Sequence, residues 1–439
     1  MKHKLFIAVI LLLCLLPAAG MFAVPQGETG GNEILSPPPA LRDSNGKLNT
    51  GFLPDLSAYV EDNYQFRQTF VTAWSYLNQK FLHTSIASGV VLGKDGWLYF
   101  SDTLEDYTGL GLLTPREIFA AAHNLSLVSE YCQTQGAQFL FTVAPNKNSL
   151  YPEHMPDLTV YHSVRNADAL AAALDAEGVP YVNLFDAFRE QSETLYFTQD
   201  SHWNSKGAAL AADKINAALH RETQYYAGPF TPDAVHSGDL YAMLYPTGKR
   251  LETDQTYSSG FAFTYDAPIR DASSLTIMTA GPGTGSLLMF RDSFGNLLYP
   301  YMAESFQNAL FSRSMPYKLD LIAQRNADFA VAELVERNLD YLVQNVPVMP
   351  APERDVTLFP NMDILPVKLE ADTASSLPGC VLVRGTLPVQ PDEKSPVYLR
   401  TDAGCWEAFL LQDNAFALYI PETAQSAENI SVVFAASAE

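Results

Sequence analysis

The chain has 439 residues, 27 Lys+Arg against 49 Asp+Glu, and a formal net charge of −22. At roughly 100–200 residues per domain, this length predicts two or three domains. The 47% hydrophobic and 12% aromatic content excludes a disordered chain or a coiled coil, and the acidic balance argues against a nucleic-acid-binding protein. The four cysteines (Cys14, Cys132, Cys380 and Cys405) lack CxxC spacing, so we expect neither a disulfide scaffold nor a structural zinc site.

The N-terminus has the composition of an export segment. Lys2 and Lys4 precede an uncharged apolar run over residues 5–24, which could be a cleaved signal peptide or a retained membrane anchor. Both alternatives place the remainder outside the cytoplasm, either secreted or anchored. Residues 25–50 are rich in Gly, Pro and polar residues, a composition typical of a flexible tether.

The next elements alternate between helices and strands. Apolar spacing over residues 52–82 predicts one or two helices. Thr114-Pro115-Arg116-Glu117 has the form of a capping box, and Gly136 is placed to end the helix that follows. Further helices are predicted over 167–176 and 206–219, and strands over 138–143, 179–185, 286–290 and 329–334. This alternation favours a mostly parallel sheet covered on both faces.

The C-terminal part has a different pattern. Pro347, Pro350 and Pro352 mark a boundary, and short alternating apolar runs after residue 355 predict a small β domain. Cys380 and Cys405 both lie in this tail and could pair after export, although their spacing does not show it.

Two segments carry residues suited to nucleophilic catalysis. Asp200-Ser201-His202-Trp203-Asn204 precedes a helix, and Arg291-Asp292-Ser293-Phe294-Gly295-Asn296 follows an apolar strand. A serine becomes a nucleophile when a histidine accepts its proton, and an acid must fix the histidine tautomer. Ser293, His202 and Asp200 could therefore form a triad. Taken singly, the serine could instead be a helix cap and the Asp-x-His a surface cap. No HExxH or His/Cys cluster indicates a metal.

The order of several motifs resembles the DHHW family and its relatives, the alginate O-acetyltransferases, whose catalytic domain is SGNH-hydrolase-like. The matching stretches are 61–67, 93–100, Pro145-Asn146-Lys147, 200–204, 291–294 and 333–337. The family's Asp-x-His and later Ser fall on Asp200, His202 and Ser293. Here the second residue of the motif is Ser201 where the family name has His, which leaves the proposed Asp–His pair unchanged.

The resemblance implies an α/β fold with an SGNH-hydrolase-like parallel sheet flanked by helices. We expect residues 1–24 to be a signal or anchor, 25–50 a tether, 51–346 the catalytic domain and 355–439 a β-sandwich-like accessory domain. The implied activity is O-acetyl transfer to a cell-surface or exported polysaccharide through acetyl-Ser293. The alternatives are a carbohydrate acetyl esterase and a non-catalytic polysaccharide-binding scaffold.

The resemblance also implies a membrane-bound acyltransferase as acetyl donor, and we expect no cofactor or metal. Backbone N–H groups near Ser293 are the default oxyanion donors. Arg291 and Lys147 are further candidates for this site, and both could equally be surface charges or ion-pair partners. Other candidate substrate-binding residues are Asn296 and Trp203, the latter alternatively a packing anchor. Three charged residues near the last predicted strand are expected to form structural ion pairs: Glu333, Glu336 and Arg337.

Overall fold

The structure is a computed structural model, and it describes residues 3–8, 10–11, 15, 20, 35–42, 46–355, 363–365, 367–372, 377–425 and 431–434. Most of the predicted export segment and parts of the predicted tether and accessory domain lie outside these residues. Among the residues described, no helix is both long and apolar enough to cross a membrane.

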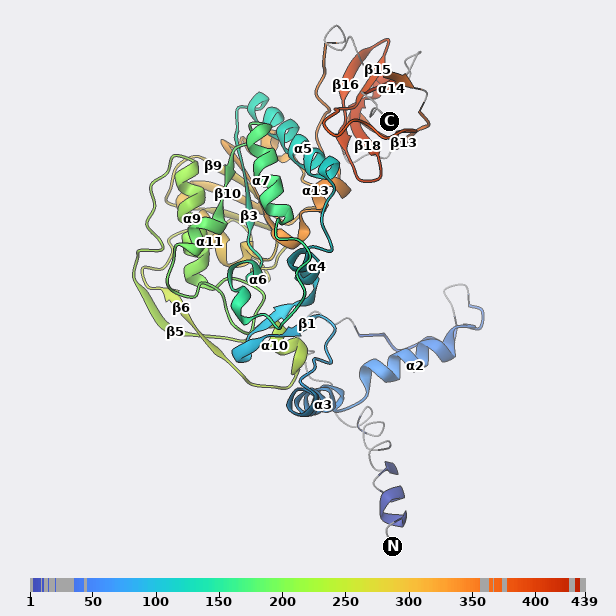
Figure 1. Ribbon diagram of the computed structural model, residues 1–439, viewed down its shortest axis with the longest axis vertical. Coiled ribbons are helices and arrows are strands. Elements are labelled where there is room, and N and C mark those ends of the chain that lie inside the picture. The colour runs from blue at the N-terminus through green and yellow to red at the C-terminus, as the bar shows by residue number, and fades with distance from the viewer. Residues whose placement is uncertain are drawn as a thin grey trace.

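A seven-stranded sheet in the order β4-β3-β11-β9-β10-β8-β7 lies at the centre of the described chain (Figure 1). Its strands are β3 (Gln138–Ala144), β4 (Tyr181–Val182), β7 (Thr264–Tyr265), β8 (Thr276–Ala280), β9 (Ser286–Phe290), β10 (Asn308–Ser312) and β11 (Phe329–Val335). The run from β4 to β10 is parallel, whereas β8 and β7 pair antiparallel at one edge. The expectation of a mostly parallel sheet in an α/β fold is confirmed.

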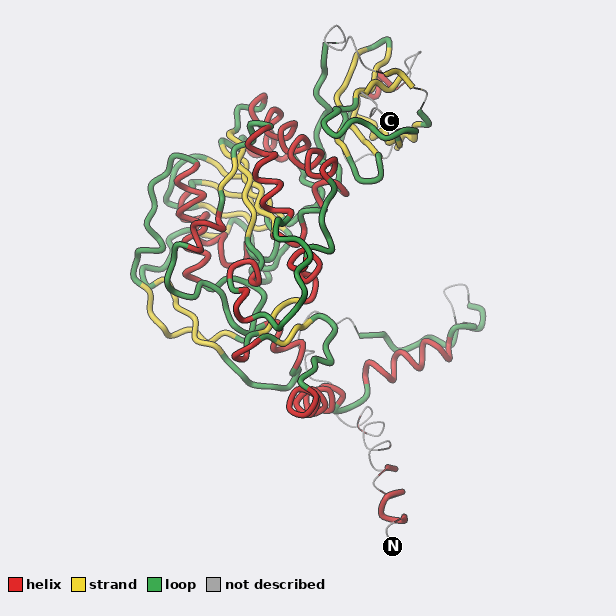
Figure 2. The backbone as a smooth tube through the Cα atoms, viewed as in Figure 1, coloured by secondary structure: helices red, strands yellow, loops and turns green. Residues whose placement is uncertain are grey.

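Helices cover both faces of this sheet (Figures 1 and 2). Alternate residues of β3 face opposite sides, so Phe139 and Phe141 join one buried cluster and Leu140 the other. The helices on the first side are α5 (Pro115–Thr134), α7 (Asn166–Ala176) and α13 (Tyr341–Gln344). Those on the second side are α8 (Leu184–Arg189), α9 (Ser205–Ala218) and α11 (Gly295–Ser305).

Local sequence signals explain where several elements begin and end. The predicted capping box at the start of α5 is confirmed, since Thr114 and Glu117 each accept the other's backbone N–H. Gly136 follows the helix with φ +79, as its position predicts. The predicted strand 179–185 is wrong beyond Val182, because the Asn183 side chain accepts the Asp186 N–H (3.3 Å) and begins α8 instead.

Shorter elements surround the carboxyl edge of the sheet. Two antiparallel pairs lie there: β1 (Val90–Leu92) with β2 (Leu98–Phe100), and β5 (Phe230–His236) with β6 (Glu252–Tyr257). The short helices at this edge are α4 (Leu104–Thr108), α6 (Lys147–Leu150) and α10 (Asp239–Leu244), whereas α12 (Leu321–Arg325) precedes β11 at the opposite edge. Single 3₁₀ turns are η1 (Lys94–Gly96), η2 (Ser101–Thr103), η3 (Pro152–His154) and η4 (Glu336–Asn338). The predicted N-terminal helices are α2 (Phe52–Asn63) and α3 (Arg67–Leu82).

The described tail residues form two four-stranded sheets, in the orders β12-β19-β15-β16 and β13-β14-β18-β17. The strands are β12 (Asp363–Leu365), β13 (Leu369–Asp372), β14 (Cys380–Thr386), β15 (Tyr398–Thr401), β16 (Gly404–Glu407), β17 (Phe409–Leu410), β18 (Ala415–Pro421) and β19 (Ser431–Phe434), with a short helix α14 (Glu422–Gln425). Cys380 and Cys405 lie in different sheets and are not joined by a disulfide.

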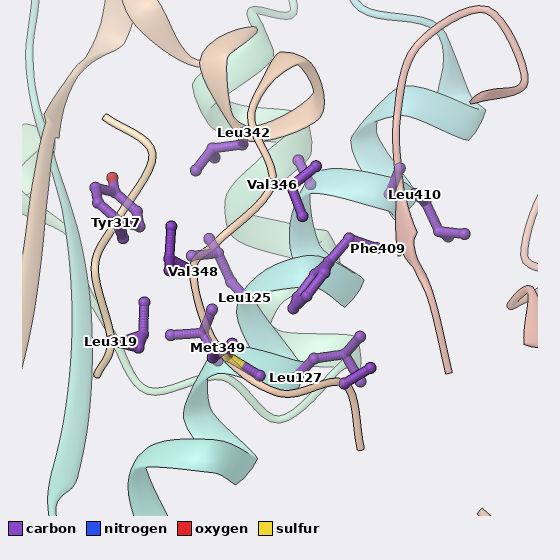
Figure 3. Packing of buried hydrophobic residues seen from close by; sticks show 14 of the residues in the cluster. Leu125, Leu127, Tyr317, Leu319, Leu342, Val346, Val348, Met349, Phe409 and Leu410 are labelled. Atoms are coloured by element: carbon purple, nitrogen blue, oxygen red, sulfur yellow. The ribbon is translucent and has the colours of Figure 1, made fainter. Parts of the chain in front are cut away.

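The tail packs directly against α5. Figure 3 shows Phe409 near Leu125 and Leu127 of α5, and Leu410 belongs to the same continuous buried cluster. The Asn124 amide reinforces this contact, since it donates to Leu410 O (2.8 Å) and accepts the Leu410 N–H (2.8 Å). Val346, Val348 and Met349 in the proline-rich segment are buried in the same cluster. This segment is therefore part of the core and does not behave as an open linker.

Candidate active site

Ser293 lies in the turn between β9 and α11, at the carboxyl edge of the sheet. Asp292 fixes this turn, because its carboxylate accepts the N–H of Phe294 (2.8 Å) and of Val335 in β11 (2.7 Å). Gly295 allows the turn to close, since a Cβ there would lie 2.6 Å from the Cβ of Arg291. The serine is thus held on a sharp strand-to-helix connection and is partly exposed.

His202 lies opposite Ser293 on the segment that precedes α9. The neighbouring Trp203 is fully buried, and its indole N–H donates to the Phe294 carbonyl (3.1 Å). Trp203 therefore joins the histidine segment to the serine turn as a packing anchor, which was one of its two expected roles. His202 itself is 22% exposed at its side chain.

Of the three residues singled out for a triad, His202 lies within hydrogen-bond distance of both Asp200 and Ser293. His202 Nδ1 is 2.7 Å from Asp200 Oδ1, and His202 Nε2 is 2.8 Å from Ser293 Oγ. Because a carboxylate can only accept, the Nδ1 atom donates and Nε2 is left to accept the Ser293 hydroxyl proton. This is the arrangement that a serine nucleophile requires.

Asp200 is almost completely buried and accepts four hydrogen bonds. Its Oδ1 accepts from the ring and backbone N–H of His202, and its Oδ2 accepts from His236 Nε2 (2.8 Å) and the Asp239 N–H (2.9 Å). Burial raises the pKa of Asp200, but the hydrogen bonds from His202 and His236 outweigh it and hold the pKa well below its usual value. Asp200 is therefore a fixed anion between two histidines.

His236 and Asp239 complete this group, and sequence reasoning missed both. Burial lowers the pKa of His236, but its hydrogen bond to the Asp200 carboxylate outweighs this effect, so the net pKa is raised. Asp239 accepts the Ser201 hydroxyl (2.6 Å), and burial together with the charge of Asp200 raises the pKa of Asp239. The sequence signal was a second short His-x-x-Asp run, which carries no periodicity and no fixed spacing from the first.

Asp200, His202 and Asp239 could also offer ligand atoms to a metal, since one atom of each lies within 4.8 Å of the others. His202 Nδ1 would be a ligand on the side facing these carboxylates, because Nε2 is turned to Ser293. That atom makes the 2.7 Å hydrogen bond to Asp200. A metal here would therefore replace the bond that orients His202 toward the serine.

Lys147 is buried beneath the histidine segment. Its ammonium donates to the backbone carbonyls of Phe197 (3.1 Å), Thr198 (3.1 Å) and Asp200 (2.5 Å), and it lies over the Trp97 ring. Burial lowers the pKa of Lys147 to about 8. All three of its donors are occupied by backbone carbonyls, so Lys147 supports the Asp200 segment.

Arg291 and Asn296 are also engaged with the protein. The Arg291 guanidinium is buried and donates to Asn296 Oδ1 (2.6 Å) and to the carbonyls of Ala272 (2.7 Å) and Ser274 (3.2 Å). Burial lowers the pKa of Arg291 to about 10. The pair connects the serine turn to the loop before β8, and the structure does not direct the guanidinium toward Ser293 Oγ.

The charged residues at the end of β11 and just after it have different surroundings. Glu336 is buried, accepts the Asn146 N–H (2.8 Å) and lies 3.7 Å from Arg165, while burial raises its pKa to about 8. Glu333 accepts the Asp292 N–H (3.1 Å), and burial raises its pKa well above the usual value. Arg337, expected in an ion pair, has none among the residues described, and its guanidinium lies over the Phe294 ring at 5.7 Å.

A cavity of about 450 Å³ lies elsewhere, between α5, α7 and residues 393–394 of the tail. Its lining is mainly apolar and includes Leu113, Ile118 and Phe119, but none of the residues grouped around Asp200. The cavity is therefore separate from the candidate active site.

Comparison with known proteins shows which families have domains similar to the one that contains this site. Residues 90–275 match the family model described as "SGNH hydrolase-like domain, acetyltransferase AlgX", a stretch that includes Asp200 and His202 and ends before Ser293. A probable alginate O-acetylase AlgJ of Pseudomonas aeruginosa is 26% identical over 220 residues, covering 46% of this chain and 51% of the relative. The AlgJ of Pseudomonas syringae pv. tomato is 26% identical over 213 residues, covering 45% and 51%.

Among solved structures, a DHHW family protein from Eubacterium siraeum aligns with TM-score 0.43 and 16% identity over 59% of this chain and 96% of its own. The chain spans about half the length of the curated relatives it matches, 51% in each case given above. The expected resemblance is confirmed: over residues 90–275 the chain resembles the SGNH hydrolase-like domain of AlgX-type acetyltransferases.

Proposed function

We propose that this chain is an extracytoplasmic O-acetyltransferase that moves acetyl groups onto polysaccharide hydroxyls through an acetyl-Ser293 intermediate. The observation that carries the proposal is the continuous hydrogen-bonded line from Asp200 through His202 to Ser293, with distances of 2.7 and 2.8 Å. The match to an acetyltransferase domain and the names of the AlgJ relatives support the reaction class and a polysaccharide acceptor.

In the first half-reaction, Ser293 Oγ attacks the carbonyl carbon of an acetyl donor while His202 Nε2 accepts the hydroxyl proton. The tetrahedral intermediate collapses, the bond to the donor's leaving oxygen breaks, and His202 returns the proton to that oxygen. Asp200 keeps the proton on Nδ1 throughout and stabilises the imidazolium that forms between the two steps. The product is acetyl-Ser293.

In the second half-reaction, a sugar hydroxyl takes the place of the donor. His202 accepts its proton, the sugar oxygen attacks the acetyl carbonyl, and the Ser293 Oγ bond breaks as the proton returns to the serine. Water in the same position would give acetyl-ester hydrolysis. Transfer and esterase activity therefore share every residue named here and differ in what occupies the acceptor position.

The Ser293 backbone N–H is the oxyanion donor that we propose. Among the described residues it donates to no protein acceptor, and it belongs to the residue whose Oγ attacks. A donor at this position is worth roughly 10²–10³ in rate in enzymes of this type. Arg337, which lies over Phe294 without an ion-pair partner among the described residues, is the cation that we propose for binding the acceptor or donor.

We further propose that a membrane-bound acyltransferase supplies the acetyl group and that the N-terminal apolar run directs the chain out of the cytoplasm. Both ideas come from the family resemblance and from residues 5–24 of the sequence. The substrates and partners of this chain are likewise proposed from the resemblance. The matched relatives are about twice as long as the region that they share with this chain, so the similarity covers only part of each relative.

The test uses p-nitrophenyl acetate as donor and alginate oligosaccharides as acceptor. Wild-type protein should give a burst of p-nitrophenol, acetyl-Ser293 by peptide mass spectrometry, and acetylated sugar. Ser293→Ala should lose all three, whereas Ser286→Ala, a serine at the opposite end of β9, should keep them.

Each alternative predicts a different result in this experiment. Acetyl-Ser293 that hydrolyses at the same rate with and without sugar, leaving the sugar unmodified, would indicate an esterase. No acetyl-enzyme under any condition would overturn the serine mechanism and favour the binding scaffold.

A further inference from the structure

Helix α3 presents an apolar stripe to solvent. Phe70, Trp74, Leu77 and Phe81 are 38%, 58%, 49% and 68% exposed, respectively. Their spacing of four, three and four residues places all of them along one face of the helix. Scattered exposed apolar residues are ordinary, but a continuous row of four large ones on one helix marks an interaction surface.

The opposite face of α3 is polar and buried. The buried residues of the helix are Thr72, Ser75 and Asn78. Thr72 Oγ1 accepts the Thr247 N–H (3.0 Å), and the Tyr76 hydroxyl bonds that of Tyr241 in α10 (2.9 Å). A surface helix of a soluble domain normally buries its apolar face, so α3 is oriented the other way round. It is attached to the protein by these polar groups and by the stacking of Tyr76 on Tyr245 (4.3 Å between ring centres), and the Phe70–Phe81 side does not take part in this attachment.

The charge around α3 also departs from the rest of the chain. Residues 63–94 contain no Asp or Glu, although the chain has 49 acidic residues and a net charge of −22. The helix carries Arg67 and Lys80, and the Lys80 ammonium lies 5.8 Å from the centre of the exposed Phe81 ring. This stretch can therefore approach an anionic surface that would repel most of the molecule.

We propose that α3 lies in the plane of a lipid bilayer surface, with the Phe70–Trp74–Leu77–Phe81 stripe in the boundary between headgroups and acyl chains. Aromatic and leucine side chains on one face, with lysine at its margin, form the pattern of an interfacial helix. Gly20, in the apolar N-terminal run, lies close to the residues just before this helix, because a Cβ at Gly20 would lie 2.6 Å from the Gln65 side chain. Figure 1 shows α3 at the end of the molecule from which the N-terminal residues project.

This placement would set the distance of the active site from the lipid. α3 is attached to α10, and α10 begins at Asp239, whose backbone N–H bonds Asp200. A lipid-bound α3 would therefore fix the orientation of the Ser293 edge relative to the membrane. The proposal does not depend on the acetyl-transfer assignment, since it concerns only how the chain meets a bilayer.

Tryptophan fluorescence tests the proposal in the full chain. Of the four tryptophans, Trp97, Trp203 and Trp406 are 7%, 0% and 5% exposed, so Trp74 is the one that lipid can reach. The chain is mixed with vesicles of phosphatidylcholine and phosphatidylglycerol in equal amounts, with bromine on the acyl chains as quencher. We expect quenching in wild type and its loss in Trp74→Phe, which keeps the apolar ring and remains bound in flotation.

A second variant tests the stripe itself. Leu77→Ser/Phe81→Ser should weaken vesicle binding by about tenfold or more, because each substitution removes apolar surface from the lipid contact. The matched control is Leu158→Ser/Leu275→Ser, which removes two exposed apolar residues elsewhere, 41% and 76% exposed. It should bind vesicles as wild type does.

Three results would overturn the proposal. The first is flotation of wild-type chain with vesicles without quenching of Trp74, which would mean that the N-terminal run alone makes the contact. The second is unchanged binding and quenching in the Leu77→Ser/Phe81→Ser variant. The third is self-association in lipid-free buffer that this variant abolishes, together with no quenching by lipid, which would assign the stripe to a second copy of the chain.

Discussion

Replacing Asp200 by asparagine tests the electrostatic centre of the proposed site with the smallest possible change of shape. The carboxylate accepts two bonds at Oδ1, both from His202, and two at Oδ2, from His236 and the Asp239 N–H. An amide can accept at only one of these positions and must present an NH₂ group at the other. In either orientation, the NH₂ group faces a backbone N–H, of His202 or of Asp239, so that two donors meet and neither can accept.

The two orientations predict the size of the effect. If the NH₂ faces His202, the ring must carry its proton on Nε2 and can no longer accept from Ser293. If it faces Asp239, the ring keeps its tautomer but loses the adjacent anion that stabilises the imidazolium. We expect acetyl transfer to fall roughly 10³–10⁴-fold, with a loss of about 1–3 kcal/mol in the free energy of unfolding from the opposed donors.

Turnover of p-nitrophenyl acetate and urea unfolding give the two quantities. Because the folded pKa of Asp200 is lowered, its stabilisation is present above the unfolded pKa of about 4 and is lost as pH falls through the folded value. The stability difference between wild type and Asp200→Asn should therefore shrink in acid. Asp213→Asn is the matched control, since Asp213 also accepts backbone N–H groups, from Tyr225 and Tyr226 (2.9 Å each), away from the site. A rate loss below tenfold in Asp200→Asn would refute the reasoning.

Substitutions at three other residues extend these predictions. His236→Leu should lower kcat roughly ten- to a hundredfold, because it removes a hydrogen-bond donor to the Asp200 anion. His236→Gln keeps a donor and should retain most of the wild-type kcat. Equal losses of kcat in the two variants, measured in steady-state assays, would contradict this role of His236. Lys147→Met should lower the free energy of unfolding by roughly 3 kcal/mol or more, because three backbone carbonyls lose their donor. An unchanged midpoint of urea unfolding would contradict the supporting role of Lys147. Burial lowers the pKa of His123, but hydrogen bonds from its two ring nitrogens to Glu177 and Glu407 raise it to about 9. Protonated His123 therefore stabilises the folded state fully below about pH 6.5, and this stabilisation is lost as pH rises through 9. The difference in Tm between wild type and His123→Gln should accordingly shrink and vanish as the pH is raised from about 6.5 past 9.

The parts of the fold that sequence predicts are those in which neighbouring residues decide the outcome. Helix α5 has a capping box at its start, an apolar repeat along its length and a terminating glycine just after it. The buried strands β3, β9 and β11 are mainly apolar runs, with Thr142 inside β3 and Glu333 inside β11 as polar exceptions. The predicted strand 179–185 failed because a single Asn183 cap outweighed the β-type composition around it. The edge of that element depended on one side-chain hydrogen bond, which composition does not reveal.

Much of the candidate site, in contrast, depends on contacts between residues that are far apart in the sequence. Asp200 and His202 could be paired because they are two residues apart, and Ser293 because it follows a strand. His236 meets Asp200 only through the β5–β6 pair and α10, so no local pattern indicates the contact. Lys147 looked like an available cation, because sequence does not show that three carbonyls of a distant segment converge on its ammonium. Long-range hydrogen bonding of polar groups is the part of this site that had no sequence signal.

The shared core between α5 and the tail changes what a truncation can reveal. A chain ended at residue 355 would remove Phe409 and Leu410 from the buried cluster that contains Leu125 and Leu127, and would leave the Asn124 amide without its two hydrogen bonds to the Leu410 backbone. Burial of one such side chain is worth about 1.5–3 kcal/mol. Loss of activity in that fragment would report a damaged α5 as readily as a missing sugar contact. The tail thus packs against the main domain and buries part of its core. Its affinity for polysaccharide is therefore better measured with surface substitutions in the intact chain.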